Sequence, residues 1–150
     1  MDILYDTSII VAGCIESHPH HRLAEPWLKY VRKKQVNLII ASHTLAECYA
    51  VLTRLPLSPK IPPSVALNLI TENIVQFAKI ISLTDQHYLS ILTELSKLNL
   101  TGSIIYDAII LKSAEKGNAN KLLTLNPKDF TRLCPHKDSY IISPDYKIIA

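Results

Sequence analysis

Short, strand-like apolar runs alternate along the chain with longer stretches whose apolar residues recur at helical spacing. The strand-like runs are the segments 3–5, 38–41, 79–82, 122–124 and 140–142. The helical spacing predicts helices over residues 19–34, 44–54, 62–70, 84–98 and 104–116, the last of which ends at Gly117. Strands that alternate with helices are typical of βαβ units, so the pattern predicts an α/β fold around a mostly parallel sheet of about five strands.

A proline-rich segment separates two of these helices. Residues 55–63 contain four prolines, which excludes both a helix interior and a central strand. We interpret the segment as an extended connector inside one domain that covers residues 1–150, because a chain of this length most simply builds one core.

Charge and cysteine content narrow the class of protein further. The formal net charge of +3 is compatible with a polyanionic substrate but is far from that of a basic nucleic-acid-binding tail. The three cysteines lie far apart without C-x-x-C pairing, which indicates reduced thiols. No apolar run approaches the ~20 residues of a membrane helix, and no basic segment precedes an apolar stretch at the start. We therefore expect a cytoplasmic protein that is neither secreted nor embedded in a membrane.

Four acidic positions stand where a carboxylate is unfavourable unless a positive charge meets it. Asp6 directly follows the run 3–5, and the segment 126–129 follows the run 122–124 and ends in Asp129. Glu47 and Asp107 lie inside helical patterns. Open α/β sheets place their ligands beyond the carboxyl ends of the strands. A fold that gathers these ends would unite the acids in a site for a divalent cation.

Three of these positions also have ordinary structural explanations. Asp6 could cap a helix that begins at Thr7. Glu47 matches the fourth residue of a capping box that starts at Thr44. The segment 126–129 could cap and open a short helix, since a proline follows its asparagine.

Asp107 is harder to explain in this way. If Ser103 caps its helix, Asp107 is the fourth helical residue, beyond the position that reciprocates in a capping box. Its neighbours in sequence are mostly isoleucine and alanine. An acid there needs a cation or a ligand, or must face water on the one exposed stripe of the helix, and we favour the first explanation.

Four ordered motifs give the chain a resemblance to a known family. They are L-Y-D-T-S-I-I at residues 4–10, A-E-C-Y-A-V-L-T-R at 46–54, Y-D-A-I-I at 106–110 and T-L-N-P-K-D-F at 124–130. In this order and spacing they resemble the PIN-domain nucleases, and within them the VapC-type toxin ribonucleases. The resemblance extends from about residue 3 to residue 142 and also includes the H-P-H-H segment at 18–21.

The resemblance implies a parallel sheet with helices on both faces and a cluster of acids that binds Mg²⁺ or Mn²⁺ for the hydrolysis of RNA phosphodiester bonds. Asp6, Glu47 and Asp107 match the family's three principal acids and are the expected catalytic and metal-binding residues. Asn126 stands where the family commonly has Asp, with Asp129 following, and both are expected as further metal ligands. The resemblance also implies a homodimer and an antitoxin that inhibits it with a basic side chain.

Further candidates for binding the RNA are Thr7, Ser8, Arg54 and Thr124. Arg54 follows Glu47 by two helical turns and could hold a phosphate, although an arginine at a helix end is equally explained by the helix dipole. Thr7 and Ser8 could hydrogen-bond a metal-bound water or cap the first helix. The histidines at 18, 20 and 21 could contact the substrate, but a polar turn is the simpler interpretation.

Other chemistries find little support. The three glycines are isolated, which argues against a dinucleotide-binding or P-loop protein, and no G-x-S-x-G elbow is present. The remaining alternative is a PIN-like scaffold of weak or no activity that binds RNA or a protein. Metal binding by the acids separates this alternative from the nuclease.

Overall fold

The computed structural model describes residues 1–136 and 139–148, and its centre is a five-stranded sheet in the order β3-β2-β1-β4-β5. The strands are β1 (Asp2–Tyr5), β2 (Asn37–Ala41), β3 (Lys79–Ile81), β4 (Lys121–Leu123) and β5 (Ile141–Ile142). Every neighbouring pair is parallel. The predicted α/β fold is therefore confirmed, and the sheet is parallel throughout.

Alternation along the strands divides the core into two layers. Ile3 and Tyr5 of β1 belong to one buried cluster, whereas Leu4 between them belongs to the other. Successive side chains of a strand point to opposite faces of the sheet, and both faces of a parallel sheet are normally covered. After a polar first residue in four of the five strands, the strands consequently consist of apolar residues.

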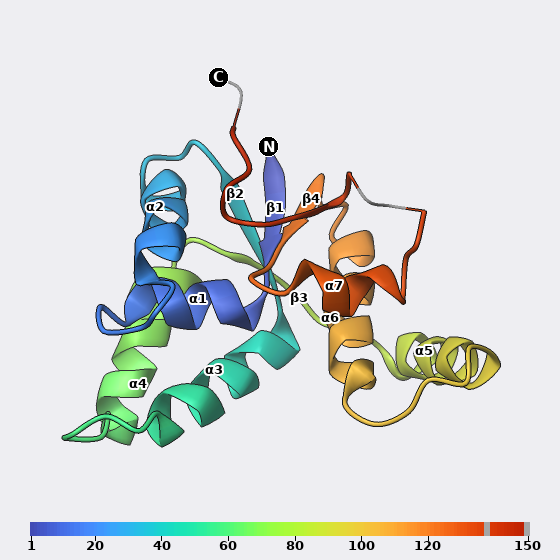
Figure 1. Cartoon of the computed structure of the whole chain (residues 1–150), viewed down its shortest axis with the longest axis horizontal. Helices are drawn as coiled ribbons and strands as arrows, with labels where there is room; N and C mark the ends of the chain where they lie inside the picture. The colour runs from blue at the N-terminus through green and yellow to red at the C-terminus, as the bar shows by residue number, and fades with distance from the viewer. Residues whose placement is uncertain (137–138, 149–150) are drawn as a thin grey trace.

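Helices cover both faces, as the family resemblance implied. One face carries α1 (Thr7–Cys14), α2 (His21–Arg32), α3 (Ser42–Arg54) and α4 (Pro63–Ile70), and η1 (Thr71–Val75) extends α4. The other face carries α6 (Ile104–Lys116) and α7 (Pro127–Thr131), and α5 (Asp85–Lys97) packs against α6 through a third cluster. In Figure 1 the helices α1 to α4 lie at the left of the strands, and α5 to α7 lie at the right.

The starts of α5 and α3 are capped differently. Thr84 is the N-cap of α5 and shares a capping box with His87. The capping box proposed for Thr44 and Glu47 is wrong, because α3 begins at Ser42 and the hydroxyl of Thr44 is buried without a hydrogen-bond partner. Glu47 therefore lies beyond the first turn of α3 and is not explained by capping.

The strand order places a topological switch point between β1 and β4. From β1 the chain moves outward through β2 and β3 on one side, and it then returns to the other side of β1 with β4 and β5. The carboxyl ends of β1 and β4 meet there, since the backbone N–H of Asp6, which follows β1, donates to the carbonyl of Leu123 in β4 at 2.9 Å. Ligand crevices of open α/β sheets form at such points.

Two further expectations concern the whole chain. Over the described residues, no helix is both long and apolar enough to cross a membrane. None of the three cysteines forms a disulfide bond.

Candidate functional site

Asp6 occupies the switch point and is fixed there by three hydrogen bonds. It is the N-cap of α1, and its carboxylate accepts from the backbone N–H of Thr7 at 2.8 Å. The hydroxyls of Ser8 and Thr124 donate to its second oxygen at 3.0 and 2.8 Å. Burial raises the pKa of Asp6, the hydrogen bonds oppose that rise, and the charge of Glu47 adds to it. Asp6 is thus both a helix cap and an oriented carboxylate.

The loop after β4 is tied to the start of α1 by the same hydroxyls. Thr124 is fully buried, and its hydroxyl also accepts from the backbone N–H of Asn126 at 3.0 Å. The backbone N–H of Leu125 donates to the hydroxyl of Ser8 at 3.1 Å. Both hydroxyls therefore have hydrogen-bond partners within the protein, and they hold the carboxylate of Asp6 in position.

Glu47 reaches the site from the middle of α3. Its carboxylate accepts a hydrogen bond from the hydroxyl of Thr7 at 2.8 Å, so α3 and α1 are linked directly beside Asp6. The Nε2 atom of His43, one turn earlier on α3, lies 3.7 Å from the same oxygen. The His43 ring stacks on Tyr106 of α6 with an angle of 4° between the ring planes.

Asp107 approaches from α6, where it is the fourth helical residue, as the sequence indicated. Its pKa is raised from 3.8 to about 7, chiefly by burial and then by the negative charges of Asp6, Asp129 and Glu47. Arg132 opposes this rise. Three other carboxylates thus lie close enough to Asp107 to repel its charge, and such crowding raises a carboxyl pKa. A cation among them would remove the repulsion.

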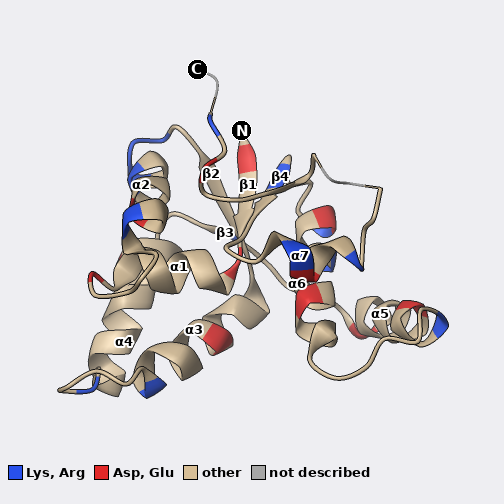
Figure 2. Cartoon of the chain, in the orientation of Figure 1, with Lys and Arg blue, Asp and Glu red and all other residues tan. Residues whose placement is uncertain are grey.

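A shared pocket of about 400 Å³ contains most of the predicted residues. It is lined by Asp6, Thr7, Ser8, Val11, His18, His20, Glu47, Val51, Asp107, Leu125 and Asn126. Asp129 does not line the pocket, but its negative charge raises the pKa of Asp107. Arg54 lines an adjoining hollow that shares only Val51 with the pocket. Figure 2 shows acidic positions on α3, on α6 and where β1 meets α1.

The donor set of this pocket suits a hard divalent cation that keeps water ligands. Carboxylate and amide oxygens are the ligands that Mg²⁺ and Mn²⁺ prefer, and Mg²⁺ usually retains several waters. Over residues 1–136 and 139–148, no three Asp, Glu, His or Cys side chains are grouped tightly enough to hold an ion by themselves. The carboxylates and the amide of the pocket would thus suit such an ion, which would keep water among its ligands.

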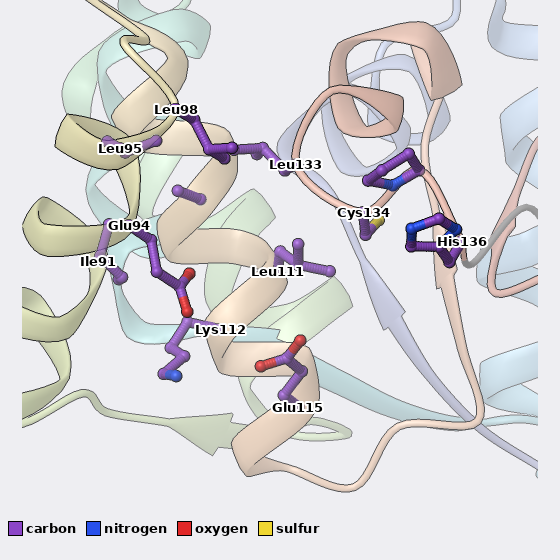
Figure 3. A pocket seen from close by; sticks show the side chains of 12 residues that line it. Ile91, Glu94, Leu95, Leu98, Leu111, Lys112, Glu115, Leu133, Cys134 and His136 are labelled. Carbon is purple, nitrogen blue, oxygen red and sulfur yellow. The ribbon is translucent and has the colours of Figure 1, made fainter.

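A second cavity, of about 270 Å³, lies apart from the acids. It opens between α5, α6 and the segment after α7, with leucines on its walls and Glu94, Lys112 and Glu115 at one side (Figure 3). None of Asp6, Glu47 and Asp107 lines it. The cavity is therefore separate from the pocket that contains these three acids.

Sequence reasoning missed two residues beside the site. It passed over His43 and Tyr106, although His43 precedes Glu47 by four positions and so shares its helix face. Tyr106 directly precedes Asp107, but only the packing of α3 against α6 brings it onto His43. The i, i+4 spacing of His43 and Glu47 was the only signal available.

The fold and the site define an α/β protein with a carboxylate centre at the switch point of a parallel sheet. A family model described as PIN domain matches residues 3–134. The chain belongs to the PIN domain family.

Two relatives agree with this assignment, and a solved structure has a similar fold. Ribonuclease VapC40 of Mycobacterium tuberculosis is 33% identical over 119 residues, which are 79% of this chain and 82% of that protein. Ribonuclease VapC27 of the same species is 29% identical over 114 residues, 76% of this chain and 77% of that protein. A toxin–antitoxin complex from Klebsiella pneumoniae contains a chain of similar fold, with a TM-score of 0.62 at 20% identity over 97% of this chain and 99% of that chain.

Proposed function

We propose that this protein is an endoribonuclease that hydrolyses RNA phosphodiester bonds with Mg²⁺ or Mn²⁺ and serves as the toxin of a toxin–antitoxin pair. Family membership and the two relatives named as ribonucleases support this function. The observation that carries it is the electrostatics of Asp107, whose pKa of about 7 reflects burial together with three other carboxylates. Structural acids are normally paired with positive groups, whereas crowded acids in a pocket are typical of a functional site.

The proposed chemistry assigns a role to each side chain. Asp6, Glu47 and Asp107 would hold the cation together with water ligands, and Asn126 and Asp129 would be further ligands. A bound divalent cation lowers the pKa of a coordinated water and offsets charge that builds on the scissile phosphate.

The chain's own contribution is to orient these ligands. The hydroxyls of Ser8 and Thr124 keep Asp6 in place, and the hydroxyl of Thr7 orients Glu47. Asp107 has a pKa near neutrality and takes up a proton there unless a positive charge faces it. Val51 and Leu125 add apolar surface to the pocket.

The partners in this proposal are an antitoxin and a second copy of the chain. An arginine or lysine of an antitoxin would find three carboxylates in the pocket, and the charge of Asp129 also acts on one of them, Asp107. Large apolar side chains are exposed on the adjacent helices α3 and α4, namely Tyr49, Val51, Val65 and Leu67. This surface supports self-association. One domain over residues 1–150 and a cytoplasmic location stay predictions.

Cleavage assays with matched variants test the function. Purified protein with Mn²⁺ or Mg²⁺ is expected to cut RNA, and EDTA is expected to stop the reaction. Asp6→Asn and Asp107→Asn should each lower the rate by at least ~100-fold, the scale on which the loss of one key electrostatic contact acts. Asp85→Asn, which changes an exposed acid on α5, should leave the rate unchanged. Undiminished cleavage by Asp107→Asn refutes the assignment, and RNA binding without any cleavage supports the non-cutting scaffold instead.

A further inference from the structure

The acidic pocket is unusual for a site that must accept a polyanion. Among its lining residues none is lysine or arginine, and three are carboxylates. The hydroxyls of Thr7 and Ser8 already donate to Glu47 and Asp6. The remaining lining side chains with N–H donors are His18, His20 and Asn126. An RNA strand that enters the pocket consequently has few protein donors for its phosphate oxygens apart from the two histidines.

His18 is held so that one ring nitrogen is defined as a donor. Its Nδ1 atom accepts a hydrogen bond from the backbone N–H of His20 at 3.1 Å. A ring nitrogen that accepts carries no proton, so the neutral imidazole has its proton on Nε2. Burial and the nearby His20 and His21 lower the pKa of His18, which favours this neutral form. The free edge of the ring therefore presents an N–H group.

The loop that carries the histidines is fixed at both ends. The backbone N–H of His18 donates to the carbonyl of Ile15, and that of His21 donates to the carbonyl of His18, both at 3.0 Å. The His21 ring lies 2.9 Å from the carbonyl of Ala12 on α1. Close packing of α1 on α2 supports the loop, because a Cβ at Gly13 would lie only 2.7 Å from Leu28. The histidines thus belong to a hydrogen-bonded loop that lines the pocket.

We propose that His18, through Nε2–H, and the adjacent His20 bind a phosphate of the RNA strand on the α1–α2 wall of the acidic pocket. This proposal rests on the ribonuclease function proposed above and names the groups that hold its substrate. The two rings lie 5.9 Å apart, close enough to face the same nucleotide. They supply neutral or weakly basic donors, which do not compete for the carboxylates as a lysine or arginine would. The pocket can then hold both a cation and a phosphate.

Paired substitutions of His18 isolate the Nε2 contact. In His18→Asn the amide oxygen can still accept from the backbone of His20, but the side chain ends short of Nε2. In His18→Gln the longer side chain returns an N–H donor near that distance. Binding of a labelled single-stranded RNA oligonucleotide is measured in Mg²⁺ in the Asp107→Asn background, so that cleavage does not intervene. His18→Asn should weaken binding about tenfold, as loss of a hydrogen bond to a charged group does, and His18→Gln should recover part of it.

The RNA can be altered instead of the protein. Single methylphosphonates placed along the oligonucleotide remove one phosphate charge at a time, and one position should weaken binding to the His18 parent but not to His18→Asn. His136→Asn, a histidine that lines the second cavity, should change nothing. In the active background KM should rise for His18→Asn while kcat changes little, because the contact exists before and during the reaction.

The outcomes separate this proposal from the ribonuclease function. Unchanged binding in His18→Asn, or a methylphosphonate effect that persists in it, overturns the phosphate contact alone. If His18→Asn lowers kcat and leaves KM unchanged, His18 acts in the chemical step or on the cation. This result also overturns the phosphate contact. A parent protein that neither binds nor cuts RNA with Mn²⁺ overturns the ribonuclease function, and the contact fails with it.

Discussion

Replacement of Asp107 by Asn is expected to stabilise the metal-free protein, although most substitutions of partly buried residues destabilise. The pKa of Asp107 is raised from 3.8 to about 7 because burial and three other carboxylates disfavour its charge. At full strength a rise of this size corresponds to about 4 kcal/mol of unfavourable free energy. Asp107 is half-buried, and water screens part of the repulsion, so we discount the effect to about 1–2 kcal/mol. For a chain of this length the melting temperature should rise by about 3–6 °C.

The pH dependence of stability provides a second test of whether Asp107→Asn stabilises the protein. Below pH 3.8 the carboxyl is protonated in both the folded and the unfolded state, so the native chain and the Asp107→Asn variant carry the same charge at this position. As the pH rises toward about 7, the unfolded chain ionises first, and the folded state loses stability relative to it. The advantage of Asp107→Asn should therefore be small at pH 4, about one third of its maximum at pH 5, and complete by pH 8.

Thermal melts in EDTA and in excess Mn²⁺ measure both effects. In EDTA at pH 8 the variant should melt above the native chain, and Mn²⁺ should stabilise the native chain by mass action much more than the variant. Asp85→Asn is the matched control, because an exposed acid in a first helical turn favours the helix and its loss should not stabilise. The crowding of the acids would be refuted if, in EDTA, the melting temperature of Asp107→Asn were no higher than that of the native chain and the gap between the two did not widen with pH.

Two other predictions follow from the contacts of the site and from the exposed apolar surface. Thr124→Val removes the hydroxyl that joins Asp6 to the backbone of Asn126, so urea unfolding should show a loss of about 1–3 kcal/mol, whereas Thr93→Val on the exposed side of α5 should cost much less. Sedimentation at micromolar concentration should show a dimer that Leu67→Glu weakens, and a strict monomer for the native chain would contradict self-association through α3 and α4.

The fold was predictable because its signals are local. The strands β1, β2, β4 and β5 contain short apolar runs whose alternate residues belong to opposite core layers, and such runs are visible in the sequence alone. The start of α3 was misplaced by two residues because β2 ends at Ala41 and the helix follows at once from Ser42. No loop or side-chain cap marks that boundary, so the capping motif at Thr44 led to a prediction of the helix start that is two residues too late.

The acids of the site were predictable for a related reason. Asp6 and Asn126 follow strands that are adjacent in the sheet, and the carboxyl ends of parallel strands share one edge. The surroundings of the acids could not be predicted in the same way. The stack of His43 on Tyr106 depends on how α3 meets α6, and the ring orientation of His18 depends on one backbone N–H of a loop.

The two principal aspartates differ in what the protein provides for their charge. Asp6 accepts hydrogen bonds from Thr7, Ser8 and Thr124, which stabilise its ionised form and fix its direction. The described hydrogen bonds include none to the carboxylate of Asp107, whose pKa is set by burial and by like charges, with only Arg132 in opposition. A cation would therefore stabilise a charge on Asp107 that none of the described hydrogen bonds stabilises. Because Asp107 lies on α6 and Asp6 precedes α1, that cation would also join the two helical layers across the carboxyl edge of the sheet.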